Sequence, residues 1–143
     1  MRNLYFMLTI TVVTFTMAAF FSGPTAAASP EEIKAICTEA DARYKEIVGD
    51  KALPPNTAIV KMYKYIFCPA ELTVKAGTTV RWINIEKRTS HDVWFKEAGN
   101  EPGDRLFSEE IWEMPFPTPG TYPYLCSPHW QQEGMKGVLK VEP

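Results

Sequence analysis

Three side chains that can bind a soft metal ion lie in one short C-terminal segment, and a fourth lies upstream of it. Cys126, His129 and Met135 follow one another closely there, and the chain has one other histidine, His91. A cysteine thiolate, two imidazoles and a weakly bound thioether form the ligand set of a trigonal copper site used in electron transfer. The spacing therefore predicts a copper site with His91, Cys126 and His129 as its main ligands and Met135 as its axial ligand.

Each of these residues also has a purely structural interpretation. A lone cysteine in a strand is usually a small buried hydrophobic residue, and a methionine often fills a core. A lone histidine in a strand is often a hydrogen-bonded core residue. His129 follows Cys126 by three residues in a chain with only 2 histidines, which favours the metal over these alternatives. If Met135 is not the axial ligand, Gln132 or Glu133 is the next candidate.

The same residues resemble the cupredoxin family of blue copper proteins, and in particular its plastocyanin and pseudoazurin type. The resemblance runs from about Ala58 to the C-terminus. Trp82-Ile83-Asn84 followed by Ser90-His91-Asp92-Val93 is similar to the family's first histidine motif, and Gly134-Met135 is similar to the end of its ligand loop. The resemblance implies an all-β fold, a Greek-key β-sandwich or barrel of seven or eight strands. The N-terminal helix described below is an addition to this fold.

Two positions differ from the family pattern. Five residues separate His129 from Met135, which is one more than in plastocyanin-like loops, and we interpret the excess as a one-residue bulge. Asp92 stands where the family usually has asparagine. An ionised aspartate cannot donate a hydrogen bond, so we expect Asp92 to accept one from a backbone amide or from the Ser127 hydroxyl, beside the metal ligands.

The resemblance implies an exported mononuclear type 1 copper protein that shuttles single electrons, with one copper ion and with His129 as the electron port. The implied partners are redox proteins, a c-type cytochrome or a periplasmic oxidoreductase, and we expect a monomer. A copper carrier or storage protein is the alternative. A copper enzyme would need a second site built largely from histidines, and both histidines are already assigned.

The first residues predict export. Arg2 precedes an apolar run that ends in small residues, which is typical of a secretory signal peptide, and we place its end at Ala28. An uncleaved membrane anchor is the alternative, because the run is nearly long enough to span a bilayer. We expect cleavage, a periplasmic location and no membrane span afterwards. Because Cys126 is assigned to the metal and export leads to an oxidising compartment, Cys37 and Cys68 are candidate disulfide partners. The alternative is that both are buried free thiols.

An amphipathic helix and a linker are predicted for residues 29–57. Ser29, Pro30 and Glu32 form a capping-box start, and Gly49 is a typical helix end. The apolar residues between them recur at helical spacing; they are Ile33, Ile36, Cys37, Ala40, Tyr44, Ile47 and Val48. This stripe must be buried against the only available partner in the chain, the β-rich remainder.

Residues 58–143 predict a single β-domain. Short runs rich in branched and aromatic residues alternate there with glycine and proline turn signals, which is typical of a sandwich or barrel. The predicted strands lie at 58–67, 69–75, 78–84, 91–95, 111–116, 121–125 and 136–141.

Composition excludes some function classes and leaves two surface features open. The formal net charge of −2 shows no basic bias, and basic and aromatic residues do not interleave in the sequence, which argues against nucleic-acid binding. Acidic residues between Glu97 and Glu113 form either a docking patch or a solvated face. Trp130, Pro123 and Pro128 form either an apolar contact rim around His129 or ordinary loop packing.

Overall fold

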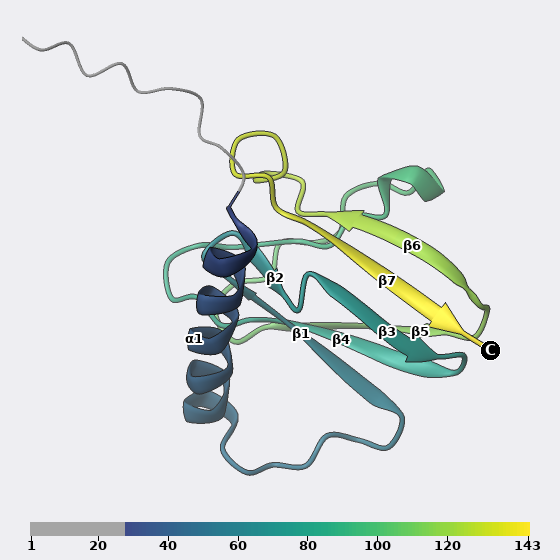
Figure 1. Cartoon of the computed structure of the whole chain (residues 1–143), viewed down its shortest axis with the longest axis horizontal. Helices are drawn as coiled ribbons and strands as arrows, with labels where there is room; N and C mark the ends of the chain where they lie inside the picture. Colours follow the sequence, from purple (N-terminus) through teal and green to yellow (C-terminus); the bar gives the residue numbers. More distant parts are fainter. Residues whose placement is uncertain (1–27) are drawn as a thin grey trace, which may run out of the picture.

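The computed structural model describes residues 28–143, so the predicted signal peptide lies, except for Ala28, outside the described residues. The first element is helix α1, Pro30–Val48 (Figure 1). The Ser29 side chain accepts a hydrogen bond from the Glu32 amide, and the Glu32 side chain accepts one from the Ser29 amide. This reciprocal capping box satisfies two amide donors that the first turn leaves without partners, which is why the helix begins here.

Among the described residues, seven strands form two sheets that face each other. The first sheet has the order β2-β1-β4-β5, and the second has the order β3-β7-β6. The β1–β4 and β3–β7 pairs are parallel, and the remaining pairs are antiparallel. The strands are β1 (Thr57–Tyr63), β2 (Ile66–Cys68), β3 (Glu71–Lys75), β4 (Thr78–Asn84), β5 (Ile111–Phe116), β6 (Gly120–Leu125) and β7 (Lys136–Glu142), and a 3₁₀ turn, η1, covers Lys96–Ala98.

The first sheet is covered on both faces along β1, β2 and part of β4, whereas β5 is mostly exposed. One face packs against the second sheet around an aromatic core that includes Trp82, Phe116 and Tyr124. The opposite face packs against α1 through a separate apolar cluster that contains Ala40 and Ile83. Burial on both sides explains why residues 82–84 of β4 are buried in succession, since only a strand with one solvated face shows strict alternation. Figure 1 shows α1 beside this sheet. The predicted stripe does pack here: Ala40 is buried, and its other members in the cluster are partly buried, namely Ile36, Cys37, Tyr44, Ile47 and Val48.

Helix α1 is also attached covalently. Cys37 of α1 and Cys68 of β2 form a disulfide with an S–S distance of 2.06 Å, so the alternative of two free thiols does not describe the structure. Two ion pairs add to this attachment, Lys61 with Asp41 and Lys64 with Glu39, which lies 2.5 Å away. Within residues 28–143, no helix has both the length and the apolar character needed to cross a membrane.

Two predicted strands differ from the observed ones. The predicted strand at 58–67 is divided by a turn at Lys64 and Tyr65, which have φ angles of 48° and 61°. The left-handed conformation is uncommon for such residues, so no turn signal was visible in the sequence. The predicted strand at 91–95 is not a strand. His91 and Trp94 each form an isolated bridge, to Leu106 and Leu125, because the segment passes from one sheet to the other.

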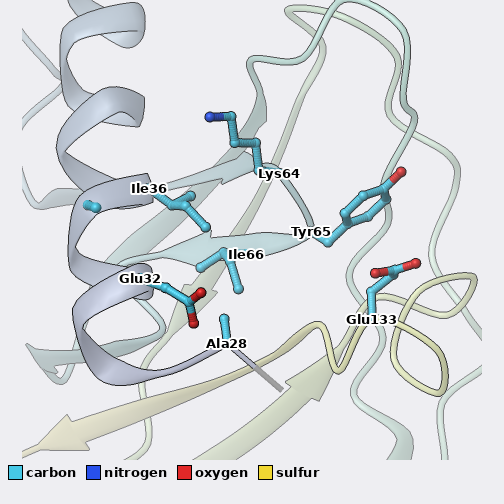
Figure 2. Close-up of a pocket in the computed structure, with 8 residues that line it drawn as sticks. Ala28, Glu32, Ile36, Lys64, Tyr65, Ile66 and Glu133 are labelled. Atoms are coloured by element: carbon cyan, nitrogen blue, oxygen red, sulfur yellow. The ribbon is translucent and has the colours of Figure 1, made fainter. Parts of the chain in front are cut away.

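A hollow separates α1 from the loop that precedes β7. Figure 2 shows this hollow, of about 330 Å³, between the first turns of α1, the turn at Lys64 and Tyr65, and Glu133. The added helix thus borders the same end of the sandwich as the segment from Cys126 to Met135.

Candidate metal centre

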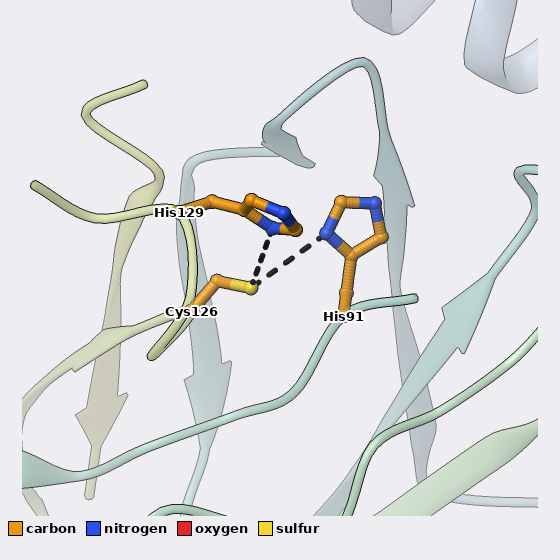
Figure 3. A group of neighbouring side chains, drawn as sticks. All are labelled: His91, Cys126 and His129. Carbon is orange, nitrogen blue, oxygen red and sulfur yellow. Dashed lines mark hydrogen bonds between the residues drawn. The ribbon is translucent and has the colours of Figure 1, made fainter. Parts of the chain in front are cut away.

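Three of the predicted metal ligands meet at one end of the sandwich. Cys126 immediately follows β6, His129 lies three residues later in the loop before β7, and His91 lies between β4 and β5. The Sγ atom of Cys126 is 3.6 Å from Nδ1 of His91 and 3.3 Å from Nδ1 of His129 (Figure 3). The ligand atoms all lie within 4.8 Å of one another, so a single ion can contact all three.

The orientation of His91 leaves one ring nitrogen free for a metal. His91 is fully buried, and its Nε2 atom lies 2.5 Å from the carboxylate of Glu86. A carboxylate only accepts hydrogen bonds, so Nε2 carries the proton and the Nδ1 lone pair faces Cys126. A carboxylate behind a metal-binding histidine fixes the tautomer and makes the imidazole a stronger donor. Glu86 was missed in the sequence, where a glutamate five residues before a histidine is not a distinctive pattern.

Burial influences the protonation of Cys126 and His129. Burial raises the pKa of the Cys126 thiol to about 12, so without a cation beside it this side chain is a neutral thiol. A bound metal ion displaces that proton and holds the thiolate. Burial also lowers the pKa of His129. This favours the neutral imidazole, the form that binds a metal.

Asp92 and Ser127 connect the two segments that carry the ligands. The Ser127 amide donates to Oδ1 of Asp92 at 2.6 Å, and the Ser127 hydroxyl donates to Oδ2 of the same carboxylate. Asp92 directly follows His91, and Ser127 directly follows Cys126. The pair therefore holds His91 and Cys126 in register across 35 residues of sequence, and Asp92 acts in it as an acceptor only.

Met135 is fully buried and is bound to the same site through its backbone. The Cys126 amide donates to the Met135 carbonyl at 3.1 Å. The two alternative axial residues, Gln132 and Glu133, are both exposed. Burial therefore favours Met135 over either of them as the axial ligand.

The extra residue of the ligand loop is taken up in a helical turn. The carbonyl of His129 accepts hydrogen bonds from the Glu133 amide at 3.0 Å and from the Met135 amide at 3.3 Å. Gly134 between them has a φ angle of 70°, a conformation that glycine adopts at little cost. This local turn returns the chain to Cys126 in spite of the longer spacing.

Tyr65 is a further neighbour that the sequence did not reveal. Its ring lies edge-on to His129, with 4.9 Å between ring centroids, and 6.2 Å from the His91 ring. It reaches this position from the turn between β1 and β2, where Tyr65 has a positive φ angle. A side chain from another strand pair thus limits the rotation of the His129 ring.

The donors present fit copper. One buried thiol and two imidazole nitrogens converge on a common point, and the nitrogen of His91 that faces away is already hydrogen-bonded. Soft sulfur and imidazole ligands select copper or zinc, and three such donors with a buried methionine beside them are typical of a type 1 copper site.

Comparison with known proteins agrees with this chemistry. The family model described as copper binding proteins of the plastocyanin/azurin family matches residues 57–142. This chain is a cupredoxin of the plastocyanin/azurin family. Amicyanin-alpha from Methylorubrum extorquens is 39% identical to it over 93 residues, which cover 62% of this chain and 75% of the relative. Plastocyanin from Scenedesmus fuscus is 37% identical over 87 residues, 54% of this chain and 87% of the relative.

Solved structures show the same likeness. An oxidised amicyanin variant has a TM-score of 0.54 and 32% identity, with coverage of 63% of this chain and 86% of amicyanin. A copper-containing nitrite reductase from Thermus scotoductus also has a TM-score of 0.54, but the match covers only 24% of that enzyme. The predicted β-sandwich, the family and the single type 1 copper ion are thus confirmed. This cupredoxin is an electron-transfer copper protein, not an enzyme.

Proposed function

We propose that this cupredoxin is an exported, monomeric one-electron shuttle, with His91, Cys126, His129 and Met135 as its copper ligands. The observation that carries the proposal is the convergence of both histidine Nδ1 atoms on the buried Cys126 sulfur. Copper, when bound, supplies a single-electron couple between Cu(I) and Cu(II). The chain's part is to hold the ligands still in both states, and the hydrogen bonds of Asp92 and Glu86 do this.

The domain boundaries are part of the same proposal. Residues 1–28 form the cleaved signal peptide, residues 29–57 the helix and linker, and residues 58–143 the copper-binding domain. The β-structure supports the last boundary to within one residue, because β1 begins at Thr57. Periplasmic export is supported by the Cys37–Cys68 disulfide, since such bonds persist in oxidising compartments.

The alternative, a copper carrier or storage protein, requires a site that exchanges metal. Here Cys126, His91 and Met135 are fully buried, which opposes exchange. The deciding measurement is the visible spectrum of the Cu(II) protein, followed by titration with a one-electron reductant. We expect an intense blue thiolate charge-transfer band that is bleached reversibly by one electron per copper. Copper bound without that band would favour the carrier.

Replacing Met135 with leucine should retain copper and colour but raise the reduction potential. Loss of a weak axial donor disfavours Cu(II) more than Cu(I), and a tenfold change in their relative affinity corresponds to about 59 mV. Voltammetry measures the shift. Met62→Leu is the matched control, because Met62 is equally buried but belongs to strand β1 in the core. If both variants shift the potential equally, Met135 is not the axial ligand.

We further propose that the partner docks beside His129 on a basic aromatic rim. The ammonium of Lys96 lies 4.4 Å from the centroid of the Trp130 ring and 5.3 Å from that of Trp94. A hollow of about 450 Å³ adjoins Trp130, and it is lined by two lysines and one carboxylate. The residues that line it are Lys96, Glu97, Pro123, Leu125, Trp130 and Lys136. The charge of this rim fits an acidic docking site on the redox partner.

Reversing one of these charges should slow electron transfer. With an acidic c-type cytochrome as partner, Lys96→Glu should lower the bimolecular rate about tenfold at low salt, because charge complementarity steers association. The difference should fade above about 0.5 M salt, where exposed charges are screened. Lys34→Glu, on the exposed face of α1, is the control for net charge. Equal effects of the two variants would argue against docking at this rim.

A further inference from the structure

The helix that precedes the family match is connected to the copper site by one arginine. Arg43 of α1 donates from Nε to the carbonyl of Ile85, at 2.5 Å and across 42 residues of sequence. Ile85 is fully buried, and its amide donates to Met62 of β1 at 3.2 Å. The Ile85 peptide is thus held from two sides, by strand β1 and by the added helix.

The next residue along the chain is Glu86, the carboxylate that orients His91. Its amide donates to Oδ1 of the buried Asn84 at 2.8 Å, and its carboxylate lies 2.5 Å from Nε2 of His91. The side chain of Glu86 is only 15% exposed, so its direction depends on where the backbone at 85–86 is held. Arg43 and Glu86 also line the same surface hollow, of about 280 Å³.

We propose that helix α1 is a working part of the copper site and that Arg43 is a positioning residue for it. By fixing the Ile85 carbonyl, Arg43 keeps the Glu86 carboxylate against His91 and so maintains that histidine as a strong donor. The family match begins at residue 57, so this support comes from a segment outside the part of the chain shared with the family. The inference rests on the proposed role of His91 as a copper ligand.

The proposal predicts the direction in which the reduction potential changes. A carboxylate that accepts from a bound imidazole strengthens it and favours Cu(II), so loss of the Glu86 contact raises the reduction potential. The positive charge of Arg43 by itself favours Cu(I), because like charges repel. Removal of that charge alone would therefore lower the potential. Positioning and simple electrostatics thus predict opposite shifts for Arg43→Met.

The test compares reduction potentials of the copper-loaded full mature chain in four forms: wild type, Arg43→Met, Glu86→Gln and the double variant. We expect Glu86→Gln to weaken Cu(II) relative to Cu(I) about tenfold, which raises the potential by about 59 mV. Arg43→Met should raise it by a smaller amount. In the Glu86→Gln background, Arg43→Met should no longer raise it, because the side chain that Arg43 positions is gone.

A second measurement does not require copper. In metal-free protein, the His91 Nε2 proton should exchange with solvent about tenfold faster in Arg43→Met than in wild type, as detected by NMR. Asp41→Asn is the matched control, because the Asp41 side chain joins α1 to Lys61 of β1. It should leave the exchange rate unchanged.

The outcomes separate this inference from the function it rests on. A wild-type protein without a blue Cu(II) form contradicts the proposed function. If the protein is blue, two results overturn only the role of Arg43. In the first, Arg43→Met lowers the potential or leaves it unchanged. In the second, Arg43→Met raises the potential equally with and without Glu86→Gln. If Arg43→Met does not fold, Arg43→Lys takes its place: it retains the charge and loses the guanidinium geometry, so the potential should again rise. An unchanged potential in folded Arg43→Lys also overturns the proposal.

Discussion

Replacing Cys126 with serine is expected to abolish the blue band and the redox activity while leaving a folded β-domain. A serine hydroxyl does not become an anion at neutral pH, so the strongest copper ligand is lost, and copper affinity should fall by more than about 100-fold. The fold should survive because the aromatic core around Trp82 and Tyr124 forms without the metal. Each large buried side chain of that core contributes about 1.5–3 kcal/mol.

Visible absorption, voltammetry and circular dichroism test this expectation together. Asp92→Asn is a suitable control, because it alters a neighbour of the site and restores the residue usual in the family while leaving all four proposed ligands in place. It should remain blue. A Cys126→Ser protein that is still blue would refute the assignment of the whole site.

Removing the disulfide should have the largest effect on stability. Replacing Cys37 and Cys68 together should lower the free energy of unfolding by about 3–4 kcal/mol in the chain-entropy model, because the bond closes a loop across 31 residues. Alanine is the better replacement, since Cys68 is fully buried and a serine hydroxyl there would have to find a hydrogen-bond partner. Urea unfolding of the metal-free protein measures the loss.

Thiol counting provides an independent check on the same bond. Denatured, unreduced, metal-free wild type should show one reactive thiol, that of Cys126. Three reactive thiols would mean that the helix is held by packing and ion pairs alone. The double alanine variant should still bind copper, because neither cysteine touches the proposed ligands, and it should unfold at lower urea than wild type.

The elements that rest on local pattern could be predicted from the sequence. The capping box of α1 lies within four residues, and the Cys126–His129 spacing lies within one loop, so short-range chemistry specifies both. His91 was predicted as the second imidazole ligand from its resemblance to the family's first histidine motif and from the count of 2 histidines. The strands of the sandwich also followed from alternation and turn signals, with two exceptions. The predicted strand at 58–67 is divided by the turn at Lys64 and Tyr65, and the segment at 91–95 forms only isolated bridges.

The support around the ligands could not be predicted in this way. Glu86 and Tyr65 lie beside the proposed ligands, and Arg43 holds the residue before Glu86. The Arg43 contact joins residues far apart in the sequence, and Tyr65 depends on a turn with positive φ angles. Single charged or aromatic residues of this kind occur throughout the chain and carry no distinctive spacing.

The loop from Cys126 to Met135 also has one feature that could be predicted from the sequence and one that could not. The sequence specified that Met135 follows His129 by an unusual interval, and from this a bulge was expected. In the folded chain the excess residue lies in a turn that closes on the His129 carbonyl, with Gly134 in a left-handed conformation. Ligand identity is a property of side chains and is written in the sequence. Ligand position depends on which distant hydrogen-bond partners the packed sheets and the helix bring together, and that is known only once the chain has folded.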